Sequence, residues 1–125
     1  MHKENFSIKK RLKSFTHAFN GLYILIREEH NSRIHLAAAI IAICFGFLLK
    51  ITLYEWMAIV FSIGLVFAFE IVNSAIESLA DFASPEKNEV IKKVKDLSAA
   101  AVLVSAIAAF IIGIIIFLPK ILSYV

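Results

Sequence analysis

The feature that most constrains this chain is a run of twenty-two residues without a formal charge, 97–118. At about 1.5 Å per residue, a helix of this length is about 33 Å long, which matches the ~30 Å hydrocarbon core of a bilayer. Hydrophobic residues make up 60% of the whole chain, against roughly 45–50% in soluble domains. The run predicts a transmembrane helix, and the composition predicts a single membrane-embedded domain over residues 1–125.

Two more segments, about 34–50 and 54–80, are expected to cross the membrane. The uncharged core of the first segment is only about 24 Å long as a helix, so its flanks must contribute to the span. Asn31 or Ser32 is a candidate N-cap for this helix. The second segment begins beside Trp56, whose position is typical of an aromatic anchor at the membrane interface.

The ends of the later helices are expected at prolines. A break is predicted around 82–84, with Ser84 as an N-cap and Pro85 in the first turn of a new helix. Pro119 and Lys120 are expected to end the last span, because proline disrupts a helix interior.

Residues 1–33 carry too many charges to enter the hydrocarbon, yet apolar side chains recur within them at helical spacing. These side chains are Leu12, Phe15, Phe19, Leu22 and Ile26. The pattern predicts an amphipathic helix on the membrane surface, with its basic face toward anionic headgroups.

The basic residues are unevenly distributed, which predicts the topology. Of thirteen Lys and Arg, seven precede residue 34, four lie between 81 and 96, and the other two are Lys50 and Lys120. Cytoplasmic segments carry the excess of Lys and Arg, so both basic regions should face the cytoplasm. The pattern indicates membrane orientation and does not indicate a nucleic-acid interface.

A stripe of polar groups follows the apolar part of the second span. Glu70, Asn73, Glu77 and Asp81 stand at i, i+3, i+7 and i+11 and therefore share one helical face. Carboxylates near hydrocarbon are costly and usually functional. The stripe is expected at the cytoplasmic interface, together with Glu29, Lys95 and Asp96, which stand near the ends of spans.

Carboxylate and amide oxygens suit Mg²⁺ better than a softer metal. The chain has four glycines and no GxxxxGK or GxGxxG motif, so metal and lysine would have to hold any phosphate. Such groups at the boundary of water and lipid favour phosphoryl transfer from a soluble nucleotide to a lipid alcohol, a reaction that depends on positioning and charge neutralisation.

Two alternatives use the same residues. A small transporter could use Glu70 and Glu77 as a proton or cation relay, although carriers usually bind near the membrane midplane. A structural membrane subunit would leave the polar stripe unexplained. Lipid-dependent consumption of ATP would separate a kinase from both.

The polar motifs resemble those of the prokaryotic integral-membrane diacylglycerol kinase family. The resemblance covers about residues 10–120 and rests on three motifs, Glu29-x-x-x-Arg33, Glu70-x-x-Asn73-Ser74-Ala75-Ile76-Glu77-x-x-x-Asp81 and Lys95-Asp96-x-x-Ala99-Ala100-Ala101-Val102. Segments 55–57 and 116–120 resemble the undecaprenol kinase branch. The resemblance therefore implies phosphorylation of undecaprenol, with diacylglycerol as the alternative acceptor.

The resemblance also implies a homotrimeric helical bundle in the bacterial inner membrane, with ATP and Mg²⁺ used in composite sites on the cytoplasmic side. It implies that Glu70 is the catalytic base and that Glu29 and Glu77 bind the metal. The implied nucleotide-binding residues are Lys10, His17, Glu29, Asn73, Glu77, Asp81, Lys95 and Asp96, and the implied lipid-binding residues are Glu70, Lys13 and Ser98. His35 stands where the enterobacterial branch has a carboxylate.

Overall fold

The chain is described by a computed structural model over residues 7–125. These residues form four helices, α1 (Ile8–Glu28), α2 (His30–Leu48), α3 (Leu53–Ala83) and α4 (Glu89–Leu122). α2, α3 and α4 are each long and apolar enough to cross a membrane. The predicted all-α membrane architecture with three spanning helices is confirmed.

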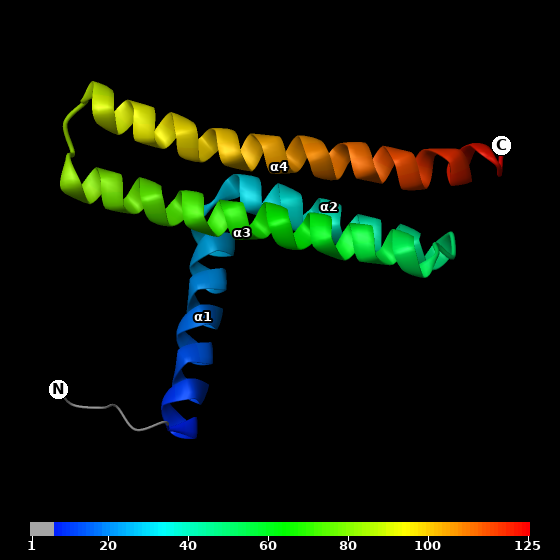
Figure 1. The fold of residues 1–125 in the computed structure, drawn as a ribbon, viewed down its shortest axis with the longest axis horizontal. Helices are drawn as coiled ribbons and strands as arrows, with labels where there is room; N and C mark the ends of the chain where they lie inside the picture. The colour runs from blue at the N-terminus through cyan, green and yellow to red at the C-terminus, as the bar shows by residue number, and fades with distance from the viewer. Residues whose placement is uncertain (1–6) are drawn as a thin grey trace.

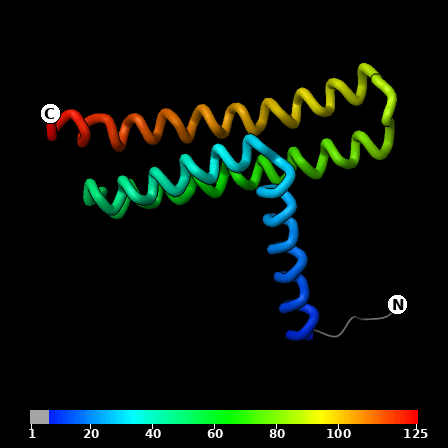
Figure 2. The backbone as a smooth tube through the Cα atoms, turned by 180° about the vertical axis from the view of Figure 1, so that it is seen from behind, coloured from blue at the N-terminus to red at the C-terminus, as the bar shows by residue number. Residues whose placement is uncertain are grey.

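The three apolar helices run alongside one another, and α1 leaves them at a steep angle (Figure 1). α3 and α4 form a long antiparallel hairpin, and α2 lies against α3, as the view from behind also shows (Figure 2). When α2, α3 and α4 cross the bilayer, α1 therefore lies close to the membrane plane. Phe15 and Phe19 of α1 are 64% and 67% exposed, which agrees with an amphipathic helix whose apolar side enters the interface.

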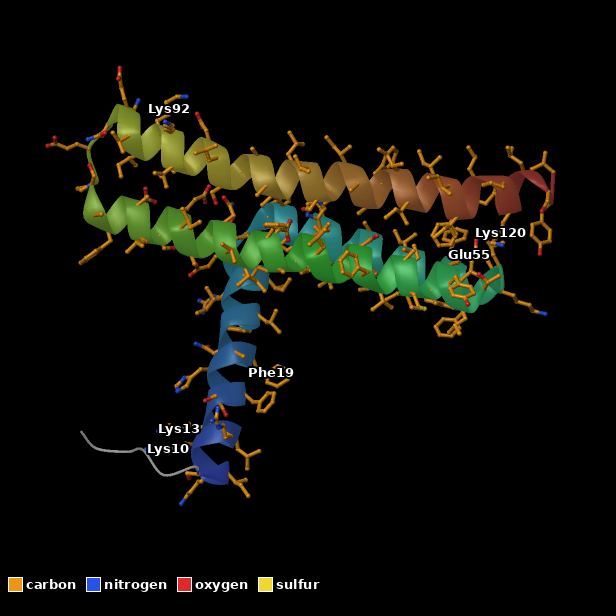
Figure 3. The ribbon with its side chains drawn as sticks, in the orientation of Figure 1. Lys10, Lys13, Phe19, Glu55, Lys92 and Lys120 are labelled. Atoms are coloured by element: carbon orange, nitrogen blue, oxygen red, sulfur yellow. The ribbon has the colours of Figure 1, made fainter. Side chains whose placement is uncertain are left out.

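The helices differ in length, and the difference decides what lies outside the bilayer. α2 has 19 residues and is about 28 Å long, close to the hydrocarbon thickness. α3 and α4 have 31 and 34 residues, or about 46 and 51 Å. The hairpin therefore extends past the bilayer at the end where α3 connects to α4. At its opposite end Lys120 pairs with Glu55 at 3.1 Å (Figure 3).

The corner between α1 and α2 is a single residue, Glu29. Its extended backbone, with φ −103° and ψ 111°, ends α1 and makes it the N-cap of α2. Arg33 donates from Nε to the Ile26 carbonyl at 2.8 Å, and its guanidinium also contacts the Arg27 carbonyl. The expectation of an N-cap at Asn31 or Ser32 is wrong, because α2 begins at His30, before either residue.

The helix break between α3 and α4 lies where it was expected, but α4 begins later than predicted. α3 ends at Ala83 with Ser84 as its C-cap, and Pro85 follows it, in the position where proline commonly stops a helix. α4 begins only at Glu89, because the Asn88 side chain accepts a 2.8 Å hydrogen bond from the N–H two residues later. The predicted start of a helix directly after Ser84 is wrong.

Pro119 does not end the last span, contrary to expectation. α4 continues through Pro119 to Leu122. Proline removes one backbone hydrogen bond and crowds the carbonyl four residues earlier. Membrane helices tolerate that loss where neighbouring groups and local adjustment satisfy the freed carbonyl, and here only one further turn follows.

At the end of the bundle opposite the α3–α4 connection, α2, α3 and α4 pack around three buried isoleucines, Ile51, Ile59 and Ile116. Trp56 is half-buried and its ring lies 4.8 Å from that of Phe47. A Cβ added to Gly46 would stand 2.5 Å from the Trp56 ring. Trp56 therefore packs α3 onto α2, a role that its expected position as an interfacial anchor did not include.

Candidate active site

Glu70 is a buried carboxylate held from α2. It is 4% exposed, although it comes from the same polar stripe as the exposed Asp81. Ser32 donates a 2.9 Å hydrogen bond from Oγ to its Oε2, and His35 Nδ1 pairs with its Oε1. Both partners lie in the first two turns of α2. The first two turns of α2 are therefore held to the middle of α3 through the Glu70 carboxylate.

Glu29 lies one helical turn closer to the hairpin connection than Glu70. Ser74, four residues after Glu70 on α3, donates a 3.2 Å hydrogen bond to Glu29 Oε1. Four residues of helix correspond to about 6 Å along the axis. The α1–α2 corner and the α3 stripe thus bring one carboxylate to the level of the membrane surface, above the buried Glu70.

The other side of the stripe faces α4. Ser98 donates a 2.7 Å hydrogen bond from Oγ to Asn73 Oδ1, and Lys95 pairs with Asp81. The negative charge of Glu77 also acts on the Lys95 ammonium. The stripe therefore lies between two helices, with Glu70 directed to α2 and Asn73 and Asp81 directed to α4.

Four of the predicted site residues do not join this group within one chain. Asp96 pairs at 2.7 Å with Lys92 on an exposed side of α4. Lys10, Lys13 and His17 are exposed on α1, and Figure 3 shows the two lysines at the end of α1 far from the hairpin. Lys10 is about 28 Å along the helix axis from Glu29.

An apolar groove begins below Glu70 and runs between α2 and α4, with α3 as its floor. Its volume is about 630 Å³. His35 lines its inner end, and Ser62 is the other polar side chain in its wall; the remaining lining comes from apolar residues such as Ala38, Phe45, Val66, Ala109 and Phe117. The groove could hold a hydrocarbon chain with its head beside His35 and Glu70.

Possible metal ligands do not cluster among the described residues of one chain. Among residues 7–125, no three His, Cys, Asp or Glu side chains lie close enough together to hold a metal ion. Mg²⁺ usually takes one or two carboxylates and completes its shell with water and substrate phosphates. A pair such as Glu29 and Glu77, with a nucleotide triphosphate, is compatible with that requirement.

Sequence reasoning missed three supporting side chains. Ser32 was considered only as a cap, Ser74 only as part of a motif, and His35 only as a departure from the carboxylate of the enterobacterial branch. The signal was present in the spacing. Ser32 and His35 stand three residues apart and therefore share one face of α2. Ser74 stands four residues after Glu70 and therefore shares its face of α3.

Comparison with known proteins decides the family. Residues 16–117 match the family described as prokaryotic diacylglycerol kinase. The chain belongs to this family. The match includes Glu29, Glu70 and Lys95 and begins after Lys10 and Lys13, and it confirms the resemblance drawn from the motifs.

Individual relatives carry two names within the family. The chain is 40% identical over 113 residues to the undecaprenol kinase of Bacillus subtilis, covering 90% of this chain and 92% of the relative. It is 34% identical over 113 residues to a diacylglycerol kinase of Synechocystis, covering 90% of this chain and 65% of that longer protein. It is 32% identical over 104 residues to the diacylglycerol kinase of Haemophilus influenzae, covering 83% and 86%.

Proposed function

We propose that this protein transfers the γ-phosphoryl group of ATP, with Mg²⁺, to the hydroxyl of a membrane lipid, and that the lipid is undecaprenol. The observation that carries the proposal is the position of Glu70. This carboxylate pairs with His35, which lines the end of the apolar groove nearest the polar stripe. A lipid hydroxyl at the head of the groove would be next to a proton-accepting group and below the groups suited to a nucleotide.

The polar groups divide by depth. Glu29 and Glu77, near the surface, would hold Mg²⁺, which neutralises phosphate charge during transfer. Asn73, Asp81 and Lys95 would contact the nucleotide. Glu70, one turn deeper, would act on the proton of the lipid hydroxyl, and Ser98 and Lys13 remain candidate contacts for the lipid head.

A single chain does not assemble the whole set, which supports a composite site between copies. Lys10, His17 and Asp96 lie on exposed faces away from Glu70 in their own chain. An α1 helix in the membrane plane can extend toward a neighbouring copy. A homotrimer in which these residues serve an adjacent site is the assembly that we propose.

The choice of undecaprenol rests on two observations. The relative with 40% identity is named undecaprenol kinase. The groove wall on α4 runs from Ala106 to Ile121, or about 22 Å, which is longer than one leaflet of a ~30 Å core and suits a long single chain. Relatives named diacylglycerol kinase keep diacylglycerol as the second candidate.

The site would face the cytoplasm of a bacterial inner membrane. Eleven of the thirteen basic residues lie in the N-terminal region and in the segment around the hairpin connection, which the positive-inside rule places on the cytoplasmic side. Membership in a kinase family argues against the transporter and structural-subunit alternatives.

The test is an acceptor panel. Purified protein in mixed micelles would receive γ-labelled ATP, Mg²⁺ and equal surface concentrations of undecaprenol, diacylglycerol or a long-chain primary alcohol. We expect label in the undecaprenol product at the highest kcat/KM. Preferential labelling of diacylglycerol would overturn the choice of acceptor, and an absence of labelled lipid with every acceptor would overturn the kinase assignment.

A further inference from the structure

Two hydrogen bonds of the same kind connect the start of α2 to the middle of α3. Ser32 on α2 donates from Oγ to Glu70 Oε2 on α3 at 2.9 Å. Ser74 on α3 donates from Oγ to Oε1 of Glu29, the N-cap of α2, at 3.2 Å. Each side therefore supplies one hydroxyl and one carboxylate, and both bonds end on groups of the proposed site.

The two bonds lie about one helical turn apart. Ser32 follows Glu29 by three residues, or about 4.5 Å along α2. Ser74 follows Glu70 by four residues, or about 6 Å along α3. Because α2 and α3 run in opposite directions (Figure 1), the two bonds lie side by side and do not cross. Together they hold the register of the two helices here, and with it the offset between Glu29 and Glu70.

The choice of partner sets Ser32 apart from two other buried serines. Ser32 is 1% exposed, and Ser62 and Ser105 are 6% and 3% exposed. Ser62 and Ser105 each donate to a carbonyl of their own helix, which is the local partner available to a serine inside a helix. Ser32 donates instead to a carboxylate of another helix. Its buried hydroxyl is therefore used to hold Glu70.

Phosphoryl transfer depends on the alignment of the groups that these bonds hold. In the proposed reaction, Glu70 accepts the proton of the lipid hydroxyl while Mg²⁺ at Glu29 holds the phosphate that the hydroxyl attacks. A misplacement of about 1 Å can cost about 10²-fold in rate. Ser32 and His35 each hold one oxygen of Glu70, and a carboxylate has about four lone-pair sites, so acceptor sites remain for the lipid hydroxyl.

We propose that Ser32 and Ser74 are positioning residues whose two hydrogen bonds align the proton acceptor Glu70 with the metal ligand Glu29. This inference rests on the proposed lipid kinase function and keeps the roles that it gives to both carboxylates. Ser32 acts on proton transfer through Glu70, and Ser74 acts on metal binding through Glu29. The competing interpretation is that the two bonds only hold α2 against α3.

The variants that separate these interpretations are Ser32→Ala and Ser74→Ala, which each remove one hydroxyl and serve as controls for one another. For Ser32→Ala we expect kcat to fall about tenfold to a hundredfold, because its partner is a charged group. Its KM for ATP and its half-saturating Mg²⁺ concentration should stay unchanged. For Ser74→Ala the half-saturating Mg²⁺ concentration should rise about two- to tenfold.

Ser105→Ala is the control for the loss of a buried hydroxyl, since Ser105 bonds only within α4. It should match wild type in kcat and in Mg²⁺ dependence. A double variant tests whether Ser32 acts through Glu70. Glu70→Asp shortens the side chain and draws the carboxylate away from Ser32, so adding Ser32→Ala to it should slow the reaction by less than about twofold.

Thermal unfolding gives a readout that needs no turnover. Mg²⁺ with a non-hydrolysable ATP analogue should raise the unfolding temperature of the wild-type protein, because a ligand that binds the native state stabilises it. The rise should be smaller for Ser74→Ala and unchanged for Ser32→Ala. Bonds that only join the helices would give both variants a lower unfolding temperature without ligand and the same rise with it.

The results that would overturn the inference are distinct. A wild-type kcat in Ser32→Ala would show that other contacts position Glu70. An equal loss of kcat and of unfolding temperature in both variants, with unchanged Mg²⁺ dependence, would show that the bonds only join α2 to α3. If the wild-type protein labels no lipid at all, the proposed function fails, and the ligand-induced rise in unfolding temperature still tests Ser74.

Discussion

The hydroxyl of Ser98 on α4 donates a 2.7 Å hydrogen bond to the amide oxygen of Asn73 on α3. The bond fixes which way the Asn73 amide points, because its oxygen accepts from Ser98 and its NH₂ group is directed elsewhere. Asn73 and Ser98 are both half-buried, so the pair is reachable from the polar end of the hairpin. We therefore propose that Ser98 supports the nucleotide side of the site, although the family resemblance implied a contact with the lipid.

Ser98→Ala should raise the KM for ATP by about two- to tenfold, because a net hydrogen bond contributes about 0.5–1.5 kcal/mol. The measurement is steady-state kinetics with ATP and lipid varied separately. Ser105→Ala is the control, since Ser105 bonds only to its own helix at the Val102 carbonyl. A change confined to the KM for lipid would return Ser98 to the lipid site.

Glu77→Gln should abolish turnover at limiting Mg²⁺, because the amide keeps the shape of the side chain but removes the charge that a hard cation needs. A Mg²⁺ titration of kcat is the measurement, and partial recovery is expected at high Mg²⁺. Glu86→Gln changes an exposed carboxylate in the hairpin connection and should titrate like wild type. Near-wild-type activity of Glu77→Gln at limiting Mg²⁺ would remove Glu77 from the metal site.

Gly46→Ala should lower the stability of the protein. The added Cβ would stand 2.5 and 2.8 Å from atoms of the Trp56 ring, and overpacking of this kind costs about 1–3 kcal/mol. Thermal unfolding in detergent is the measurement. Gly64→Ala is the matched control, because nothing lies within 4 Å of its added Cβ, and alanine favours a helix over glycine by up to about 1 kcal/mol.

Arg33→Ala should lower both the unfolding temperature and the activity, because the guanidinium is the donor that holds the last turn of α1 to the first turn of α2. Charge-assisted hydrogen bonds contribute about 1.5–3 kcal/mol. Arg33→Lys should recover only part of the loss, since lysine lacks the planar fork of donors. Equal stability of Arg33→Ala and wild type would show that the corner is held by other contacts.

Topology can be tested by cysteine labelling in a variant without Cys44. Glu86→Cys lies in the hairpin connection and Ser123→Cys lies after α4, and both positions are exposed. A membrane-impermeant reagent added to intact cells should label position 123 and label position 86 only after permeabilisation. The reverse pattern would invert the orientation that the basic residues predict.

The spans could be predicted from the sequence because hydrocarbon imposes one simple requirement, a long apolar helix. The helix ends could not, because several residues were chemically able to cap. Ser84 and Asn88 are both good N-cap residues, and the structure uses Asn88 for α4. Likewise Asn31 and Ser32 fit an N-cap, yet α2 begins at His30 and Glu29 is its N-cap, without a side-chain capping bond.

The polar stripe could also be predicted, because helical spacing alone places its members on one face. Its partners could not, since they depend on how far α2 and α4 slide along α3. A shift of α2 by one turn would separate His35 from Glu70. That register is a property of the packed helices, in which Glu29 forms the corner before α2 and Gly46 lies against Trp56.

Glu29 is the single residue between a helix in the membrane plane and a helix across the membrane. Its carboxylate therefore takes its position from the angle between those two directions. Bilayers of different thickness change the tilt of spanning helices, and a change in the tilt of α2 relative to α1 would move the proposed metal ligand. The thickness of the surrounding bilayer would then be one of the quantities that set the rate of this enzyme, without any lipid entering the site.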